Sequence, residues 1–165
     1  MQLIFNIKKL LKNEFEADSD FYYKRVFIYP ILITHDRQYD TPGFSDLVSS
    51  WFEDELEILA EEKLFIHHIK PLTVINIDSL IYNQICLSEN ISLHRVINKY
   101  HEHIKIDPKK KFSSVEEYKE YRLEKMIPFS WFIDEYFFQI GCREIPPVFQ
   151  LLKSELFEEE NLNDQ

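Results

Sequence analysis

Glycine is scarce in this chain: Gly43 and Gly141 are the only two among 165 residues, against roughly 7% in average proteins. Loops that cradle phosphates with backbone amides need glycine where the chain turns at positive φ or approaches the ligand closely. Two glycines so far apart allow neither the pattern G-x-x-x-x-G-K-[ST] nor the pattern G-x-G-x-x-G. The sequence therefore counts strongly against a P-loop NTPase or an ordinary Rossmann dinucleotide-binding domain.

Cysteine is equally rare, and Cys86 and Cys142 are the only two. They lie in separate segments, so neither a C-x-x-C redox pair nor a zinc ribbon is present. The sequence also lacks a cationic leader followed by an apolar stretch, and no apolar run approaches 18 residues. We therefore predict a cytoplasmic protein without a membrane span, in which both thiols are inert packing residues.

Basic residues are outnumbered, and the formal net charge is −10. Nucleic-acid binding requires a basic surface that neutralises phosphates, so it stays possible but has no support from the net charge. The one dense basic run, 109–111 beside Lys105, is typical of a solvated loop. With 45% hydrophobic and 29% charged residues, we predict one domain over 1–157 that folds without metal or disulfide, followed by an acidic disordered tail over 158–165.

Two apolar runs predict two buried strands. The run over 26–34 is β-branched and aromatic, as is typical of a strand buried on both faces, although Pro30 indicates an edge or a bulge. The run over 71–77 has the same character. Strand, long helix and strand together predict a right-handed crossover that places the two strands in one parallel sheet. Two strands are few for an independent sheet, so either the first residues supply a third or the chain is part of something larger.

Helical patterns account for most of the remaining chain. Over 42–62, apolar residues recur every three or four positions, with Thr41 or Asp40 as the expected cap and Pro42 in the first turn. Asp78 and Ser79 are expected to cap a short helix through about residue 86. Further helices are predicted over 5–15, 92–103, 114–126, 128–140 and 147–158. The fold class is thus α/β: a small, mainly parallel sheet flanked by helices, with a helical carboxyl-terminal half.

Ionisable side chains follow the first strand, at His35, Asp36, Arg37 and Asp40. Parallel strands end at the same edge of a sheet, so these side chains should lie near Asp78, where α/β proteins usually bind ligands. In that case Asp36 and Asp78 are candidate ligands of a divalent cation such as Mg²⁺, His35 a candidate general base and Arg37 an anion partner.

The alternative explanation of this cluster is capping alone. Asp36 and Asp40 then cap the turn, Arg37 pairs with either of them, and Asp78 caps the following helix. The other histidines form no metal motif, because His101 and His103 point to different helix faces. His94 and His101 share a face but have no third ligand nearby, so a solvated helix surface is expected there.

The order of elements resembles the later half of restriction-endonuclease-like nuclease domains. The resemblance covers about 1–88 and rests on YKRVFIYPILITHD, the PGF turn, the long helix and KPLTVINIDSL. The family binds Mg²⁺ through an acidic residue followed, on a neighbouring strand, by D/E-x-K. Neither 20–22 nor 61–63 supplies that motif on a strand, so the resemblance implies that the catalytic half is missing from this chain.

Two functions follow from these observations. The first is a non-enzymatic accessory or interaction module that works with a protein partner or as a homo-oligomer, without a cofactor. It could be a nuclease-related remnant or the carboxyl-terminal part of a larger protein. The alternative is a metal-dependent phosphodiesterase or nuclease-like hydrolase that uses Asp36 and Asp78 at the strand ends. Whether the chain is an enzyme stays open at the level of sequence.

Overall fold

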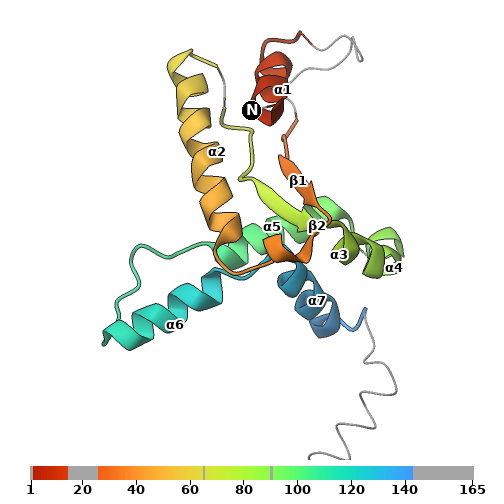
Figure 1. Ribbon diagram of the computed structural model, residues 1–165, viewed down its shortest axis with the longest axis vertical. Helices are drawn as coiled ribbons and strands as arrows, with labels where there is room; N and C mark the ends of the chain where they lie inside the picture. Colours follow the sequence, from red (N-terminus) through yellow and green to blue (C-terminus); the bar gives the residue numbers. More distant parts are fainter. Residues whose placement is uncertain (1, 15–25, 65, 90, 143–165) are drawn as a thin grey trace, which may run out of the picture.

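The computed structural model describes residues 2–14, 26–64, 66–89 and 91–142. The predicted helix over 147–158 and the predicted tail over 158–165 lie outside them. The predicted α/β class with a helical carboxyl-terminal half is confirmed (Figure 1). In chain order the elements are α1 Gln2–Leu11, β1 Ile31–Thr34, the 3-10 helix η2 Arg37–Tyr39, α2 Phe44–Glu61, β2 Thr73–Asn76, α3 Ile77–Tyr82, α4 Gln84–Glu89, α5 Leu93–Ile104, α6 Val115–Lys125 and α7 Phe129–Gln139.

β1 and β2 form a parallel pair, as the crossover pattern predicts, with Ile31 opposite Thr73 and Thr34 opposite Asn76. Both strands are shorter than the apolar runs from which they were predicted. Within residues 26–30, the described part of the first apolar run that precedes β1, the pairing is reduced to an isolated bridge between Ile28 and Ile69. Pro30 separates this bridge from β1, because proline has no N–H to add to a ladder.

The two strands differ in burial, and here the prediction for the first strand is wrong. Every residue of β2 is buried, whereas Leu32 and Ile33 of β1 are exposed to solvent. β2 lies against α2, α3 and α7, although in this two-stranded sheet each strand lies at an edge. An apolar run therefore does not distinguish a strand that helices cover from a strand with exposed side chains.

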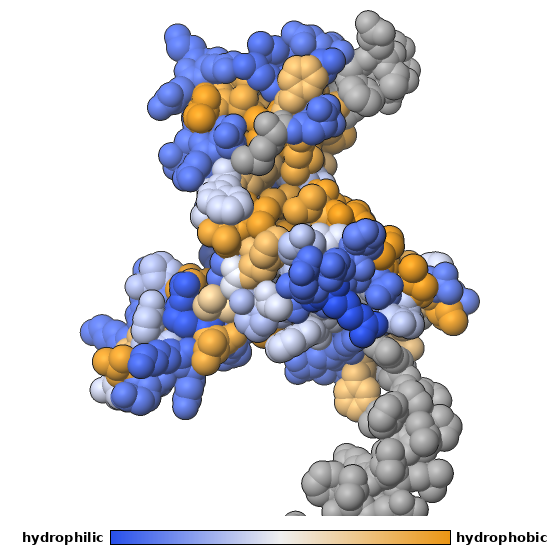
Figure 2. Space-filling view, viewed as in Figure 1, coloured by the Kyte–Doolittle hydropathy of each residue, from blue (hydrophilic) through white to orange (hydrophobic). Residues whose placement is uncertain are grey.

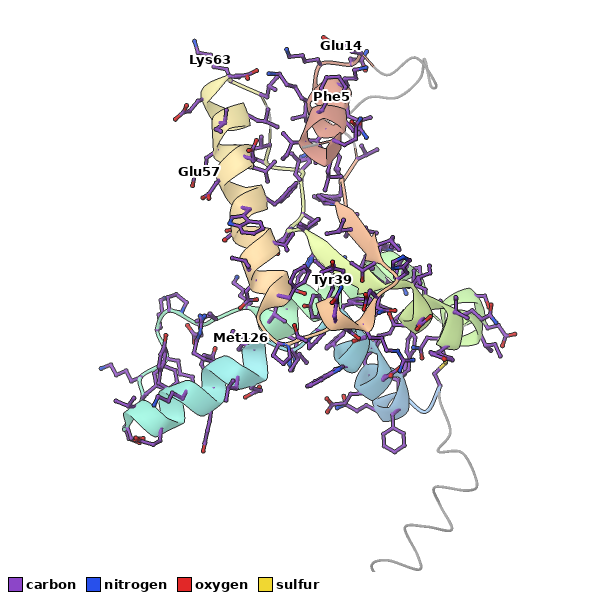
Figure 3. The ribbon with its side chains drawn as sticks, viewed as in Figure 1. Phe5, Glu14, Tyr39, Glu57, Lys63 and Met126 are labelled. Carbon is purple, nitrogen blue, oxygen red and sulfur yellow. A yellow bond between two sulfur atoms is a disulfide. The ribbon has the colours of Figure 1, made fainter. Side chains whose placement is uncertain are left out.

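α2 begins at Phe44 rather than at Pro42, and its N-cap is Gly43 rather than Thr41 or Asp40. Gly43 has φ +84°, a conformation that glycine adopts without steric cost. Its N–H donates to the Met126 carbonyl at 3.2 Å, and a Cβ there would lie 2.8 Å from Met126 Cε. The close approach of these two segments fixes the start of the helix (Figure 3).

The apolar side chains form two clusters on either side of the strand pair. Phe52 and Leu59 of α2 pack with Ile4, Ile7 and Leu11 of α1, and these two helices stand side by side in Figure 1. The exposed Glu57 points away from this contact (Figure 3). The larger cluster joins β2, α5 and α7 through Ile75, Val96, Ile97, Tyr100, Phe129, Phe132, Ile133 and Phe137.

Two local features mark the start of α6 and the end of α7. Ser114 Oγ accepts a hydrogen bond from the Glu117 N–H at 3.0 Å at the start of α6, and Gly141 has φ +68° just beyond α7. α7 is apolar around most of its surface, and it buries Phe129, Phe132, Ile133 and Phe137 while Trp131 and Phe138 stay exposed.

Cys86 and Cys142 form a disulfide, which corrects the expectation of two independent thiols. The bond joins α4 to the segment after α7. Disulfides are typical of oxidising compartments, so the pairing removes one argument for a cytoplasmic location. Among the described residues, no helix is both long enough and apolar enough to cross a membrane.

Candidate functional site

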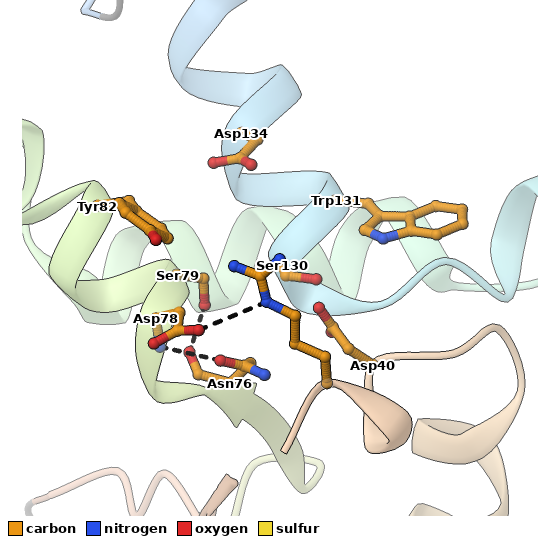
Figure 4. A pocket seen from close by; sticks show the side chains of 9 residues that line it. Asp40, Asn76, Asp78, Ser79, Tyr82, Ser130, Trp131 and Asp134 are labelled. Carbon is orange, nitrogen blue, oxygen red and sulfur yellow. Dashed lines mark hydrogen bonds and ion pairs between the residues drawn. The ribbon is translucent and has the colours of Figure 1, made fainter. Parts of the chain in front are cut away.

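A cavity of about 430 Å³ opens at the carboxyl ends of β1 and β2 (Figure 4). Its volume lies within the range of small-molecule sites. β2 and α3 form one side of it, η2 and the following turn another, and α7 a third. The lining residues are Arg37, Asp40, Asn76, Asp78, Ser79, Tyr82, Ser130, Trp131 and Asp134.

The structure brings together three of the five residues expected here. Arg37, Asp40 and Asp78 line the cavity, whereas His35 and Asp36 do not. Arg37 Nε lies 3.5 Å from Asp78 Oδ2, and both side chains are substantially exposed. Arg37 therefore pairs with Asp78, not with Asp36 or Asp40 as the capping alternative expected.

Capping explains Asp36 but not Asp78. Asp36 Oδ1 accepts from the Gln38 N–H at 2.9 Å and so caps η2. The cap of α3 is Asn76, whose Oδ1 accepts from the Asp78 N–H at 2.9 Å. Because the second strand ends at Asn76, the cap lies two residues before the predicted one, and Asp78 occupies the first turn with its carboxylate at the cavity.

Sequence reasoning missed the contribution of α7. Trp131 and Asp134 are three residues apart and so share one side of the helix; both line the cavity with Ser130. Asn83, buried at the end of α3, positions Asp134: its Nδ2 donates at 2.9 Å both to Asp134 Oδ1 and to the Ser79 carbonyl. The i, i+3 spacing was visible in the sequence, but the contact between α3 and α7 was not.

Two buried polar atoms at this cavity have no hydrogen-bond partner among the described residues. They are Asn76 Nδ2 and Ser130 Oγ, in side chains that are only 3% and 8% exposed. A buried polar group without a partner costs about 1–3 kcal/mol. Asn76 Oδ1 accepts the capping hydrogen bond of α3, and this bond fixes the orientation of the carboxamide. Its Nδ2 group donates to no acceptor among the described residues.

A metal ion is not supported by the donor set at the strand ends. Asp36 is occupied by its cap and Asp78 pairs with Arg37. Among the described residues, no three His, Cys, Asp or Glu side chains are placed to hold a metal ion. The residues present do not fit the divalent cation of the hydrolase alternative, and we derive no step through one.

A second, larger cavity of about 980 Å³ lies among α2, α5 and α6. His101 lines it and corrects the expectation of a solvated histidine: its Nε2 lies 2.9 Å from Thr73 Oγ1. Burial, and to a smaller extent the charge of Lys70, lower the His101 pKa to about 4. Burial also raises the pKa of Asp46, an effect that Arg122 partly offsets. Both acidic and basic side chains line this cavity, and we assign it no ligand.

Comparison of the chain with known proteins identifies no relative. No family model, curated protein or solved structure matches the chain.

Proposed function

We propose that this protein is a non-enzymatic interaction module that binds an extended segment of a partner protein along the open edge of β1. The observation that carries this proposal is the exposure of that strand. Leu32 is 39% and Ile33 49% exposed, although both belong to a parallel pair. Strands of parallel sheets are usually covered on both faces.

The edge of β1 offers backbone groups as well as apolar surface. Among the described residues β1 pairs only with β2, and a strand paired on one side leaves a row of N–H and C=O groups open to another strand. Added strands obtain affinity from these main-chain hydrogen bonds and specificity from alternate side chains. A short, two-stranded sheet would gain stability from a further strand.

The apolar surface continues beyond the strand. Figure 2 shows hydrophobic residues gathered over the sheet and continuing toward α3 and α4, where Ile81 and Ile85 are exposed. Contiguous apolar surface of this kind marks interaction sites in soluble proteins. A partner that pairs with β1 would therefore also cover part of these two short helices.

The charge of the chain favours a different protein over a second copy. Each copy carries a formal charge of −10, so two copies repel each other at low ionic strength. A neutral or basic partner avoids this cost. The resemblance to nuclease domains remains an expectation about origin, and the proposal assigns no catalytic residue from it.

Site-specific photocrosslinking in the host cell tests the proposal. A photoreactive amino acid at Ile33 should give a discrete adduct with one partner protein, whereas the same group at Ile58, similarly exposed on α2, should not. Ile33→Lys should abolish binding of the purified partner, with Ile58→Lys as the matched control. Adducts at both positions or at neither would contradict the proposal, and an adduct of doubled mass would identify a second copy as the occupant.

A further inference from the structure

Main-chain groups of β1 point alternately toward β2 and toward the open edge of the strand pair. The Pro30 carbonyl accepts from the Thr73 N–H at 3.0 Å, so the backbone of Pro30 faces β2. In a parallel ladder, successive residues of one strand direct their N–H and C=O groups to opposite edges. Leu32 therefore also faces β2. The N–H and C=O groups of Ile31 and Ile33 face the open edge.

These outward groups are unused. Among the described residues, no hydrogen bond engages the main chain of Ile31 or Ile33 on that side. Pro30 leaves this edge intact, because the N–H that proline lacks would face β2. The opposite edge of the pair belongs to β2, whose residues are all buried. The accessible edge of the described sheet is therefore that of β1 (Figure 1).

The exposed side chains of β1 lie on opposite faces of the sheet. Leu32 is 39% and Ile33 49% exposed, and successive side chains of a strand alternate between the two faces. Ile33 lies opposite Ile75, a buried member of the larger apolar cluster, and so shares its face. Leu32 lies opposite Val74 on the other face. A strand added beside β1 therefore meets apolar surface on both of its own faces.

We propose that the partner segment is a strand with apolar residues at successive positions, which pairs with the outward N–H and C=O groups of Ile31 and Ile33. This inference rests on the proposed function and names the chemistry of its partner. Strands buried on both faces are nearly continuously apolar, whereas an alternating strand would place polar side chains against either Leu32 or Ile33. Basic residues flank the segment, because a chain with a formal charge of −10 attracts positive charge.

A helix fits this edge less well than a strand. The main-chain groups of a helix bond within the helix, so a docked helix covers apolar side chains but leaves the outward groups of Ile31 and Ile33 without partners. An extended segment satisfies the side chains and the main chain together.

Fluorescence anisotropy with fluorescein-labelled peptides tests the chemistry of the segment. The peptide KKVIVIKK should bind saturably. KKVTVTKK has the same charge but a polar face, and it should bind at least about tenfold more weakly, because less apolar surface is buried. N-methylation of both valines leaves one edge of KKVIVIKK free to pair, so binding should stay within about threefold. N-methylation of every central residue removes the N–H groups from both edges and should abolish binding.

Two substitutions at one position separate the main chain from the side chain. Ile33→Pro removes an N–H that pairing with β2 does not use, so circular dichroism should show an intact fold. Ile33→Ala loses apolar surface but keeps the N–H. KKVIVIKK should bind to Ile33→Pro at least about tenfold more weakly than to Ile33→Ala. If Ile33→Pro does not fold, the N-methylated peptides decide whether the main chain is used.

Three results would overturn this inference: no saturable binding of KKVIVIKK, equal binding of KKVTVTKK, or equal binding of the fully N-methylated peptide. Equal binding to folded Ile33→Pro and to Ile33→Ala would overturn it as well. Photocrosslinking at Ile33 tests the proposed function separately. A partner adduct there, together with equal binding of the two unmethylated peptides, would keep the edge as the binding site and remove only the assigned chemistry.

Discussion

At the scale of single residues, burial gives His101 a pH-dependent role in stability. Its pKa falls from 6.5 to about 4 in the folded protein. Between about pH 6.5 and pH 4, His101 is therefore protonated in the unfolded chain but neutral in the native state. Stability is therefore complete above about pH 6.5 and is lost as the pH falls toward 4. A pKa shift of this size corresponds to at most about 3 kcal/mol, and the partial exposure of His101 reduces the contribution to about 1–2 kcal/mol.

Urea denaturation at pH 7.5 and 4.5 measures this effect. The free energy of unfolding should fall by about 1–2 kcal/mol more in the wild type than in His101→Gln, because glutamine does not titrate and still offers Thr73 a hydrogen-bonding group. An identical pH dependence in the two proteins would show that His101 contributes nothing to acid sensitivity.

Residues at the site were predictable only where one strand end decides their position. The shared edge of parallel strands brought Arg37 and Asp78 together, as strand order predicts. Asn76 was not predicted, because the apolar run predicts a second strand that ends at Ile77, one residue beyond the observed end of β2. The expected cap of the following helix therefore fell on Asp78 instead of Asn76. Ser130, Trp131 and Asp134 reach the cavity through tertiary packing of α7, which leaves no local signal in the sequence.

At the scale of elements, serine at the start of two helices should contribute differently to stability. Ser114 Oγ accepts from the Glu117 N–H at the start of α6, whereas Ser92 precedes α5 without a side-chain cap bond. We expect Ser114→Ala to lower the free energy of unfolding by about 1 kcal/mol and Ser92→Ala to change it by less than about 0.5 kcal/mol. Chemical denaturation measures both, and equal losses would contradict the assignment of the α6 cap.

Periodicity predicts elements better than it predicts their surroundings. The interval of three and four residues located α2, and the pairing of β1 with β2 followed from their order in the chain. The exposure of Leu32 and Ile33 could not be predicted in this way, because the same apolar residues are found in strands that a helix covers and in strands that bind a partner. Likewise Trp51 and Leu47 continue the apolar stripe of α2 yet stay exposed.

At the scale of the whole molecule, the disulfide is the feature least visible in the sequence. Cys86 and Cys142 are separated by 56 positions, and pairing depends on distance and direction in the fold rather than on spacing. The bond links α4 to the segment after α7 and so closes a loop that contains α5, α6 and α7. Cys86 belongs to the larger apolar cluster, and Cys142 packs against it.

This closure predicts a large effect of reduction. Loop-entropy arguments give about 4 kcal/mol for a loop of this length, so Cys142→Ser should lower the free energy of unfolding by about 2–4 kcal/mol, measured by urea denaturation without reductant. Dithiothreitol should destabilise the wild type to a similar extent and leave Cys142→Ser unaffected. Thiol titration of the native protein should find no free thiol. Two reactive thiols there, with equal stability of wild type and variant, would mean that the native protein does not form this bond and that packing alone holds α4 against α7.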